Sequence, residues 1–182
     1  MVTTSTSNGE RKRYHHGDLR ATLVETGLKC LECCDRADIS LRQIARDAGV
    51  SATAVYRHFP DKNALMAAMA EIGVEKLGKY QWEATREAGS IAAALNESGR
   101  AYVRFALAHP ALFRLISAHP HPDGIAIFGE SLAARMLQGY AKTFRSDERE
   151  AQRLMIQVWS VVHGMAMLML DGMLPQDEAL ID

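Results

Sequence analysis

The stretch from Ser40 to Lys62, SLRQIARDAGVSATAVYRHFPDK, reads as two short helices joined by a turn centred on one glycine. Ser40 is placed to cap the first helix. The apolar residues of that helix share one face: Leu41, Ile44, Ala45 and Ala48. Gly49 can adopt the left-handed backbone that ends a helix, and Val50 can fill the gap between the two helices. The order and length of these parts predict a helix-turn-helix unit.

The second helix is expected from Ala52 to Phe59, with Ser51 as its cap and Pro60 preventing its continuation. Val55 and Phe59 face inward at this spacing. The outward face is Thr53, Ala54 and Arg57, edged by Tyr56 and His58. Small and hydrogen-bonding side chains in this order favour a helix that contacts base edges in the major groove. The alternative is two packed helices in an ordinary all-α domain, because such spacing also arises by chance.

These residues resemble the DNA-binding motif of the TetR family of bacterial transcription regulators. The resemblance lies in Gly49-Val50-Ser51, Val55-Tyr56-Arg57-His58-Phe59, Asp61-Lys62 and Ala64-Leu65. It is specific over residues 40 to 65 and extends back to about Arg13. It implies an all-α fold with an N-terminal three-helix DNA-binding head, joined to a larger helical body that binds an effector and dimerises.

The resemblance also implies a homodimeric repressor, whose two reading helices enter successive major grooves of a palindromic operator in double-stranded DNA. The expected DNA-binding residues are Arg42, Ser51, Thr53, Ala54, Tyr56, Arg57, His58 and Lys62. Thr53, Ala54 and Arg57 would read bases, and Tyr56, His58 and Lys62 would hold phosphates. Ala52 and Ala54 are smaller than the polar residues often found on such a face, which leaves the specificity assignment open.

The charge distribution agrees in sign with DNA binding at the N-terminal end. The 182 residues are nearly neutral overall, with 21 Lys and Arg against 22 Asp and Glu. Residues 1–62 hold ten Lys and Arg against eight Asp and Glu, whereas the remainder holds eleven against fourteen. We expect a disordered basic arm (1–12), the helix-turn-helix head (13–60), a connecting helix (61–88) and an effector-binding and dimerisation domain (89–182).

The N-terminal arm either follows the phosphate backbone or is simply a solvated tail. The first helix is expected from about Gly17-Asp18 to Cys34 or Asp35. Its three cysteines, Cys30, Cys33 and Cys34, lie within one turn in a chain without a recognisable secretory leader. They are expected to be reduced thiols of a cytoplasmic protein, although metal binding or oxidant sensing is an alternative. In the family, movement of the connecting helix links the effector to the separation of the reading helices.

Two long helices are expected at the end of the body, over about 125–144 and 147–174. The second is apolar from Met155 to Leu170 but too short for a membrane span. The expected dimer interface is Leu132, Met136, Gln157, Ser160, Gly164 and Asp171, and the alternative is that this helix is the centre of the body. The run from Val158 to Gly164 resembles the tryptophan, histidine and glycine signature of one TetR subgroup.

An apolar pocket for a small hydrophobic effector is expected within the body. The expected lining is Phe105, His109, Phe113, Met136, Trp159, His163 and Met167, and the alternative is that these residues only fill the core.

No cofactor is expected. The loop His119-Pro120-His121-Pro122-Asp123 permits a zinc site, with His109 or His163 as a further ligand, in a metal sensor or an all-α enzyme. The sequence lacks a recognisable catalytic motif, so an enzyme is not expected. A DNA-binding protein without an effector, with a solidly packed body, is a further alternative.

Overall fold

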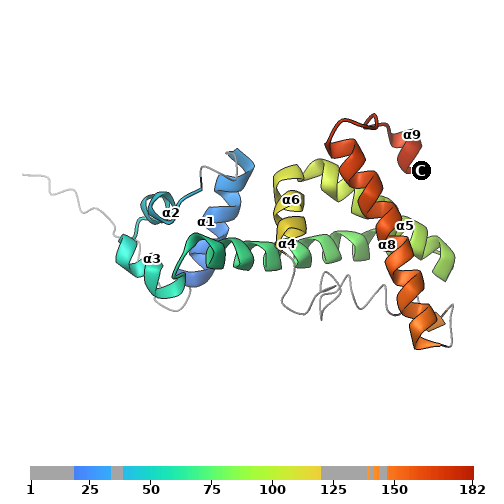
Figure 1. Cartoon of the computed structure of the whole chain (residues 1–182), viewed down its shortest axis with the longest axis horizontal. Coiled ribbons are helices and arrows are strands. Elements are labelled where there is room, and N and C mark those ends of the chain that lie inside the picture. Colours follow the sequence, from blue (N-terminus) through green and yellow to red (C-terminus); the bar gives the residue numbers. More distant parts are fainter. Residues whose placement is uncertain (1–18, 34–38, 120–138, 140–141, 144–146) are drawn as a thin grey trace, which may run out of the picture.

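The computed structural model describes residues 19–33, 39–119, 139, 142–143 and 147–182, and every element within them is a helix (Figure 1). The elements are α1 (Leu19–Cys33), α2 (Leu41–Asp47), α3 (Ala52–His58), α4 (Lys62–Thr85), α5 (Ile91–Ala108), α6 (Pro110–Ala118), α8 (Glu148–Leu170) and α9 (Glu178–Ile181). Helices α1 to α3 form a head at one end, and α5, α6, α8 and α9 form the body. The long helix α4 runs from the head into the body. The predicted all-α architecture is confirmed.

The turn between α2 and α3 follows the residues predicted for it. Gly49 has a φ of 68°, in the left-handed region. Its amide donates to the carbonyl of Arg46 at 3.1 Å, and the amide of Val50 donates to the carbonyl of Ala45 at 2.9 Å. These two bonds satisfy carbonyls that the end of α2 would otherwise leave unpaired. The turn is therefore a glycine-dependent helix stop that sets where α3 begins.

Alanine at Gly49 is expected to lower the free energy of unfolding by about 1–2 kcal/mol, because a Cβ disfavours the left-handed backbone. Gly89 is the matched control. Among the described residues nothing lies within 4 Å of a Cβ at either position, but of the two only Gly49 has a positive φ. Gly89→Ala should be neutral or stabilising by up to about 1 kcal/mol. Urea unfolding of the two variants measures the difference, and equal effects would contradict the assignment of backbone strain to Gly49.

Helix α6 packs closely on α4 at a second glycine. A Cβ on Gly73 would lie 2.9 Å from side-chain carbons of Ile116 and Leu112, both on α6. Only glycine therefore permits this approach without a shift of the neighbouring side chains. Because α6 also contacts α1, the body is packed against both the connecting helix and the head.

The last long helix is shorter than predicted, ending at Leu170 and not near residue 174. Gly172 has a φ of 72°, and the amide of Met173 donates to the carbonyl of Leu168 at 2.8 Å. This is a second glycine stop, which the apolar pattern concealed. The short α9 after it was not predicted. The basic arm, Cys34, the histidine-rich loop beyond His119 and most of the helix expected over 125–144 lie outside the described residues.

Candidate nucleic-acid interface

The recognition candidate α3 presents one side to the core and the other to solvent. Val55 is fully buried and Phe59 is 2% exposed. Thr53 and Arg57 are exposed, and Ala54 is half-buried. Tyr56 and His58, at the edges of the predicted face, are also exposed. The structure thus brings the predicted base-reading and edge residues together on one accessible helix.

The remaining predicted DNA contacts lie at the ends of the neighbouring elements. Arg42 is exposed in the first turn of α2, and Lys62 is the half-buried first residue of α4. The Ser51 hydroxyl accepts the amide hydrogen of Ala54 at 3.2 Å, which caps α3. A hydroxyl that accepts a cap bond keeps its own hydrogen for a phosphate oxygen. Contacts to DNA through these residues stay predictions.

Arg20 contacts the residue that directly follows α3, an interaction that was not predicted from the sequence. Its guanidinium lies 5.3 Å from the centre of the Phe59 ring, in cation–π geometry. Arg20 is in the first turn of α1, and Phe59 directly follows α3. Nothing in the local pattern of either helix signals this contact, because it depends on how α1 crosses the end of α3.

Helix α8 exposes a stripe of mostly small or apolar residues along one face. Val161 is 69% exposed and Leu168 is 40% exposed. By helical spacing the same face contains Gln157 and Ser160, which are exposed, and Gly164, where a Cβ would meet nothing within 4 Å in the part of the chain that the structure describes. We call these five residues the α8 stripe. It contains three of the residues predicted for the dimer interface.

Of the other predicted interface residues, the structure describes Asp171. Asp171 follows the end of α8 and pairs with Arg114 of α6 in the same chain at 2.5 Å. Leu132 and Met136 lie outside the described residues. The pocket role predicted for Met136 therefore also stays a prediction.

Two family models match separate parts of the chain. Residues 23–69 match the description "Bacterial regulatory proteins, tetR family", and residues 95–182 match "Tetracyclin repressor-like, C-terminal domain". The first match contains the glycine stop and α3, and the second begins within α5 and contains α6, α8 and α9. The chain belongs to the TetR family. It is therefore a DNA-binding transcription regulator by family, as predicted, although the tryptophan, histidine and glycine subgroup is not confirmed.

The chain is also similar to individual proteins, two of them by structure and one by sequence. A protein of unknown function from Rhodococcus sp. RHA1 is 30% identical, with 93% of both chains covered and a TM-score of 0.75. A TetR family transcription regulator from Marinobacter aquaeolei VT8 is 19% identical, with 89% of this chain and 88% of that chain covered and a TM-score of 0.64. Nucleoid occlusion factor SlmA from Marinomonas sp. (strain MWYL1) is 28% identical over 121 residues, 66% of this chain and 59% of that protein. The match thus spans less than two thirds of SlmA.

By length and composition alone, the apolar helix of the TetR body is long enough to cross a membrane over Arg153–Leu170, whereas the apolar stretch was predicted to be too short for this. Only 11% of that stretch is buried within one chain. The C-terminal family match spans this helix, so the helix belongs to the body of a TetR regulator. Its exposed apolar surface is expected to be covered by contact with something other than its own chain.

The residues predicted for the effector pocket of this TetR body pack largely against one another. The ring of His163 stacks on Trp159 at a centroid distance of 5.0 Å and lies 5.6 Å from Phe113. The rings of Phe105 and His109 are 4.9 Å apart. A separate cavity of about 360 Å³ includes His109 and is lined by Leu28, Leu31, Glu32, Lys76, Ala108, His109, Pro110, Ala111 and Leu112. The predicted effector role of these aromatic residues stays a prediction.

Tyr102, which the sequence did not single out, is the polar centre of this aromatic group. The indole nitrogen of Trp159 donates to the Tyr102 oxygen at 3.2 Å. The Tyr102 hydroxyl is 2.9 Å from Nδ1 of His163. Because indole is only a donor and the Tyr102 oxygen accepts its bond, the phenol hydrogen is available for Nδ1 of His163 when the imidazole carries its proton on Nε2. Burial raises the pKa of Tyr102 to about 12, despite the opposing Trp159 bond, so the phenol keeps its hydrogen.

Acid is expected to destabilise the body through His163. Burial lowers the pKa of this imidazole below its ordinary value of 6.5. The unfolded chain therefore takes up a proton more readily than the folded chain, and the stability present above pH 6.5 is lost as pH falls through the lowered pKa. A proton on Nδ1 would also remove the acceptor of the Tyr102 hydroxyl.

Urea unfolding at neutral pH and at about pH 5 tests this expectation. The fall in the unfolding midpoint should be larger for the natural chain than for His163→Gln, which cannot titrate. His58→Gln is the matched control, because His58 is exposed. An equal fall in all three proteins would show that other groups cause the acid effect.

The metal alternative lies mostly beyond the part of the chain that the structure describes. Within that part, no group of three or more His, Cys, Asp or Glu side chains can hold a metal ion. His119 is described, and Leu115 supplies a carbonyl 3.0 Å from its Nδ1. Cys30 donates its thiol hydrogen to Asp47 at 3.4 Å.

Proposed function

We propose that this TetR-family chain is a cytoplasmic, homodimeric, ligand-responsive repressor that acts by binding a palindromic operator and catalyses no reaction. The observation that carries the proposal is that Val55 of α3 and Phe59 directly after it are buried, whereas Thr53 and Arg57 of α3 are exposed. Val55 and Phe59 hold the helix on the head, which leaves the polar face accessible for a major groove.

The polar face divides into two kinds of contact. Arg57 can present its planar guanidinium to two acceptors of a guanine, and Thr53 can contact a base edge or a thymine methyl. Tyr56, His58 and Lys62 flank that face and are suited to phosphates, which position the helix without reading sequence. Arg42 at the start of α2 adds a further positive charge near the backbone.

The α8 stripe supports the proposal of a homodimer. Val161 and Leu168 leave apolar surface exposed on a helix whose Gly164 permits close approach of another helix. Two copies of α8 facing each other would cover both stripes in a two-fold arrangement. Such a dimer supports the proposal because it holds two α3 helices at a set distance, as a palindrome requires.

Regulation by an effector is supported by the continuity of packing from the body to the head. Helix α4 spans both, and α6 contacts α4 at Gly73 with no room for a Cβ. A change in the position of α6 therefore moves α4 or strains this contact. We propose that an effector shifts the body between two packings and so alters the distance between the paired α3 helices.

Single substitutions in the head separate the two kinds of DNA contact. Lys62→Ala should weaken binding to all duplexes similarly and reduce the slope of log K against log salt by about one unit. Arg57→Ala should cost about 1–3 kcal/mol and relax the preference at one defined base position. Fluorescence anisotropy over a salt series, with single-base variants of the selected site, measures both. An unchanged slope for Lys62→Ala would remove it from the interface, and an intact base preference for Arg57→Ala would limit it to the backbone.

Selection of bound duplexes from a random DNA pool tests the proposed function directly. The expected product is a palindrome whose half-sites are about one helical turn apart, bound by two chains. Recovery of no enriched sequence, or of one asymmetric site bound by a single chain, would contradict the proposal. The selection needs no effector, so it is independent of any ligand experiment.

A further inference from the structure

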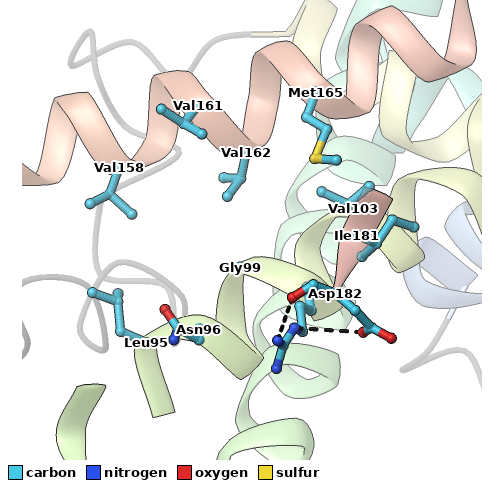
Figure 2. Close-up of a pocket in the computed structure, with 11 residues that line it drawn as sticks. Leu95, Asn96, Gly99, Val103, Val158, Val161, Val162, Met165, Ile181 and Asp182 are labelled. Carbon is cyan, nitrogen blue, oxygen red and sulfur yellow. Dashed lines mark hydrogen bonds and ion pairs between the residues drawn. The ribbon is translucent and has the colours of Figure 1, made fainter. Parts of the chain in front are cut away.

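A cavity of about 420 Å³ lies between α5 and α8 and is closed at one end by α9 (Figure 2). Val158 and Val162 extend from α8 toward Leu95 and Asn96 of α5. The lining is Leu95, Asn96, Gly99, Arg100, Val103, Val158, Val161, Val162, Met165, Ile181 and Asp182. Most of these side chains are apolar, and Arg100 is the only cation among them.

We propose that this cavity binds a small amphipathic carboxylate, with its apolar chain between α5 and α8 and its carboxylate on Arg100. The proposal rests on the proposed function in one respect: such a ligand would be the effector. The volume lies within the range of small-molecule sites, about 300–1,000 Å³. The end of the cavity holds Arg100 paired with the Asp182 carboxylate. An anion with an apolar tail can take the place of Asp182 there, whereas a neutral or cationic ligand gains no charged bond to Arg100.

Arg100 already binds carbonyl and carboxylate oxygens in the place where the ligand would sit. One of its terminal nitrogens donates to the main-chain oxygen of Asp182 at 2.6 Å, and its Nε lies 3.6 Å from the Asp182 carboxylate. Its other terminal nitrogen pairs with Glu97 at 2.6 Å. The guanidinium is therefore oriented for an oxyanion before a ligand arrives.

The α9 segment is the internal competitor for this position. Arg104 binds both Glu178 and Asp182, and Ile181 is buried at the end of the cavity. The acidic partners Glu178 and Asp182 are more than half exposed, so the ion pairs that hold α9 are individually weak. A ligand carboxylate that takes the place of Asp182 on Arg100 would loosen α9 from α5.

The cavity borders the proposed dimer surface. Val161 belongs both to the cavity lining and to the α8 stripe, and Gly99 brings α5 close to α8, since a Cβ there would lie 3.2 Å from Val162. A ligand chain inserted between the two helices must therefore separate them or move the side chain of Val162. Either change would alter the surface that α8 offers to a second copy.

Isothermal titration of the full chain, without DNA, tests the site with three probes of equal chain length. Decanoate, decanol and decyltrimethylammonium differ only in the head group, and each is used below its micelle concentration. We expect decanoate to bind more tightly than the other two by about tenfold or more, because only it gains charged hydrogen bonds to Arg100. Equal binding of the three probes, or binding of none, would overturn the proposal.

Four variants then locate the site. Arg100→Gln should weaken decanoate by about tenfold or more and leave decanol unchanged. Asp182→Asn should tighten decanoate by about two- to fivefold, because it removes the competing carboxylate. Val158→Phe should weaken both probes by filling the cavity. Arg86→Gln, at an exposed arginine paired with Glu83, is the matched control and should change nothing.

The cavity of about 360 Å³ is the alternative binding site for an anion, because Lys76 is among its lining residues. If Lys76→Gln weakens decanoate and Arg100→Gln does not, the anion binds there and the proposal is wrong. Circular dichroism of Arg100→Gln shows whether the variant folds, and Asp182→Asn provides an independent gain of affinity that misfolding cannot mimic. DNA selection proceeds without ligand, so failure here leaves the proposed repressor function intact.

Discussion

Gly164→Glu is expected to convert the proposed dimer to a monomer and to weaken operator binding by about 10²- to 10⁴-fold, which is the gain in affinity when two linked half-site contacts form together. Gly164 is on the α8 stripe, and a Cβ there meets no atom of the described residues within 4 Å. Glutamate is therefore accommodated by the folded monomer. In a dimer of facing α8 helices the same side chain would bring two carboxylates into an apolar contact, which disfavours association.

Ala84→Glu is the matched control, because Ala84 is exposed on α4 and gains the same charge outside the α8 stripe. Mass photometry gives the stoichiometry, and anisotropy with the selected duplex gives the affinity. Circular dichroism should show an intact helical chain for both variants. If Gly164→Glu remains a dimer with natural affinity, the chains associate through another surface and the α8 assignment is wrong.

Phe113→Ala is expected to lower the free energy of unfolding by about 3–5 kcal/mol, the cost of removing a fully packed aromatic side chain. Phe113 is 1% exposed and sits where α5, α6 and α8 meet. Its ring lies 5.4 Å from Tyr102 and 5.6 Å from His163. Truncation thus leaves a void against three helices, and the loss should appear as a lower urea midpoint.

Tyr56→Ala is the matched aromatic truncation at the surface of α3, where Tyr56 is 47% exposed. It should change the free energy of unfolding by no more than about 0.5 kcal/mol. It should nevertheless weaken DNA binding, because the phenol is placed for a phosphate. The pair therefore separates stability from recognition. A large stability loss for Tyr56→Ala, or none for Phe113→Ala, would contradict the burial on which both expectations rest.

The head was predictable because its shape depends on interactions within one or two helical turns. Ser40 and Ser51 cap the helices that directly follow them, at 3.2 Å in each case. Gly49 ends α2 through its own backbone conformation. The spacing of Val55 and Phe59 decides which side of α3 is buried, and that spacing also exposes Arg57. The family resemblance covered these same residues.

The body was predictable as helices but not as contacts. Tyr102 contacts Trp159 and His163, which are 57 and 61 residues away in the sequence. Helical periodicity predicts only that each of these side chains faces inward. The buried amide of Gln81, which donates to Ser98 of α5 at 3.0 Å, was likewise invisible in the pattern. Long-range pairing requires the crossing of helices, which no local spacing specifies.

The sequence by itself determined the all-helical fold class, the position of the turn between α2 and α3, and which face of α3 is polar. These features depend on caps, glycine stops and periodicity, which act locally. Only the tertiary structure decided where empty space remains in the body. The cavity between α5 and α8 exists because Gly99 sets their approach near Val162 while α9 closes one end through Arg100 and Arg104. Such a volume is the difference between several packed surfaces, so it depends on all of them at once.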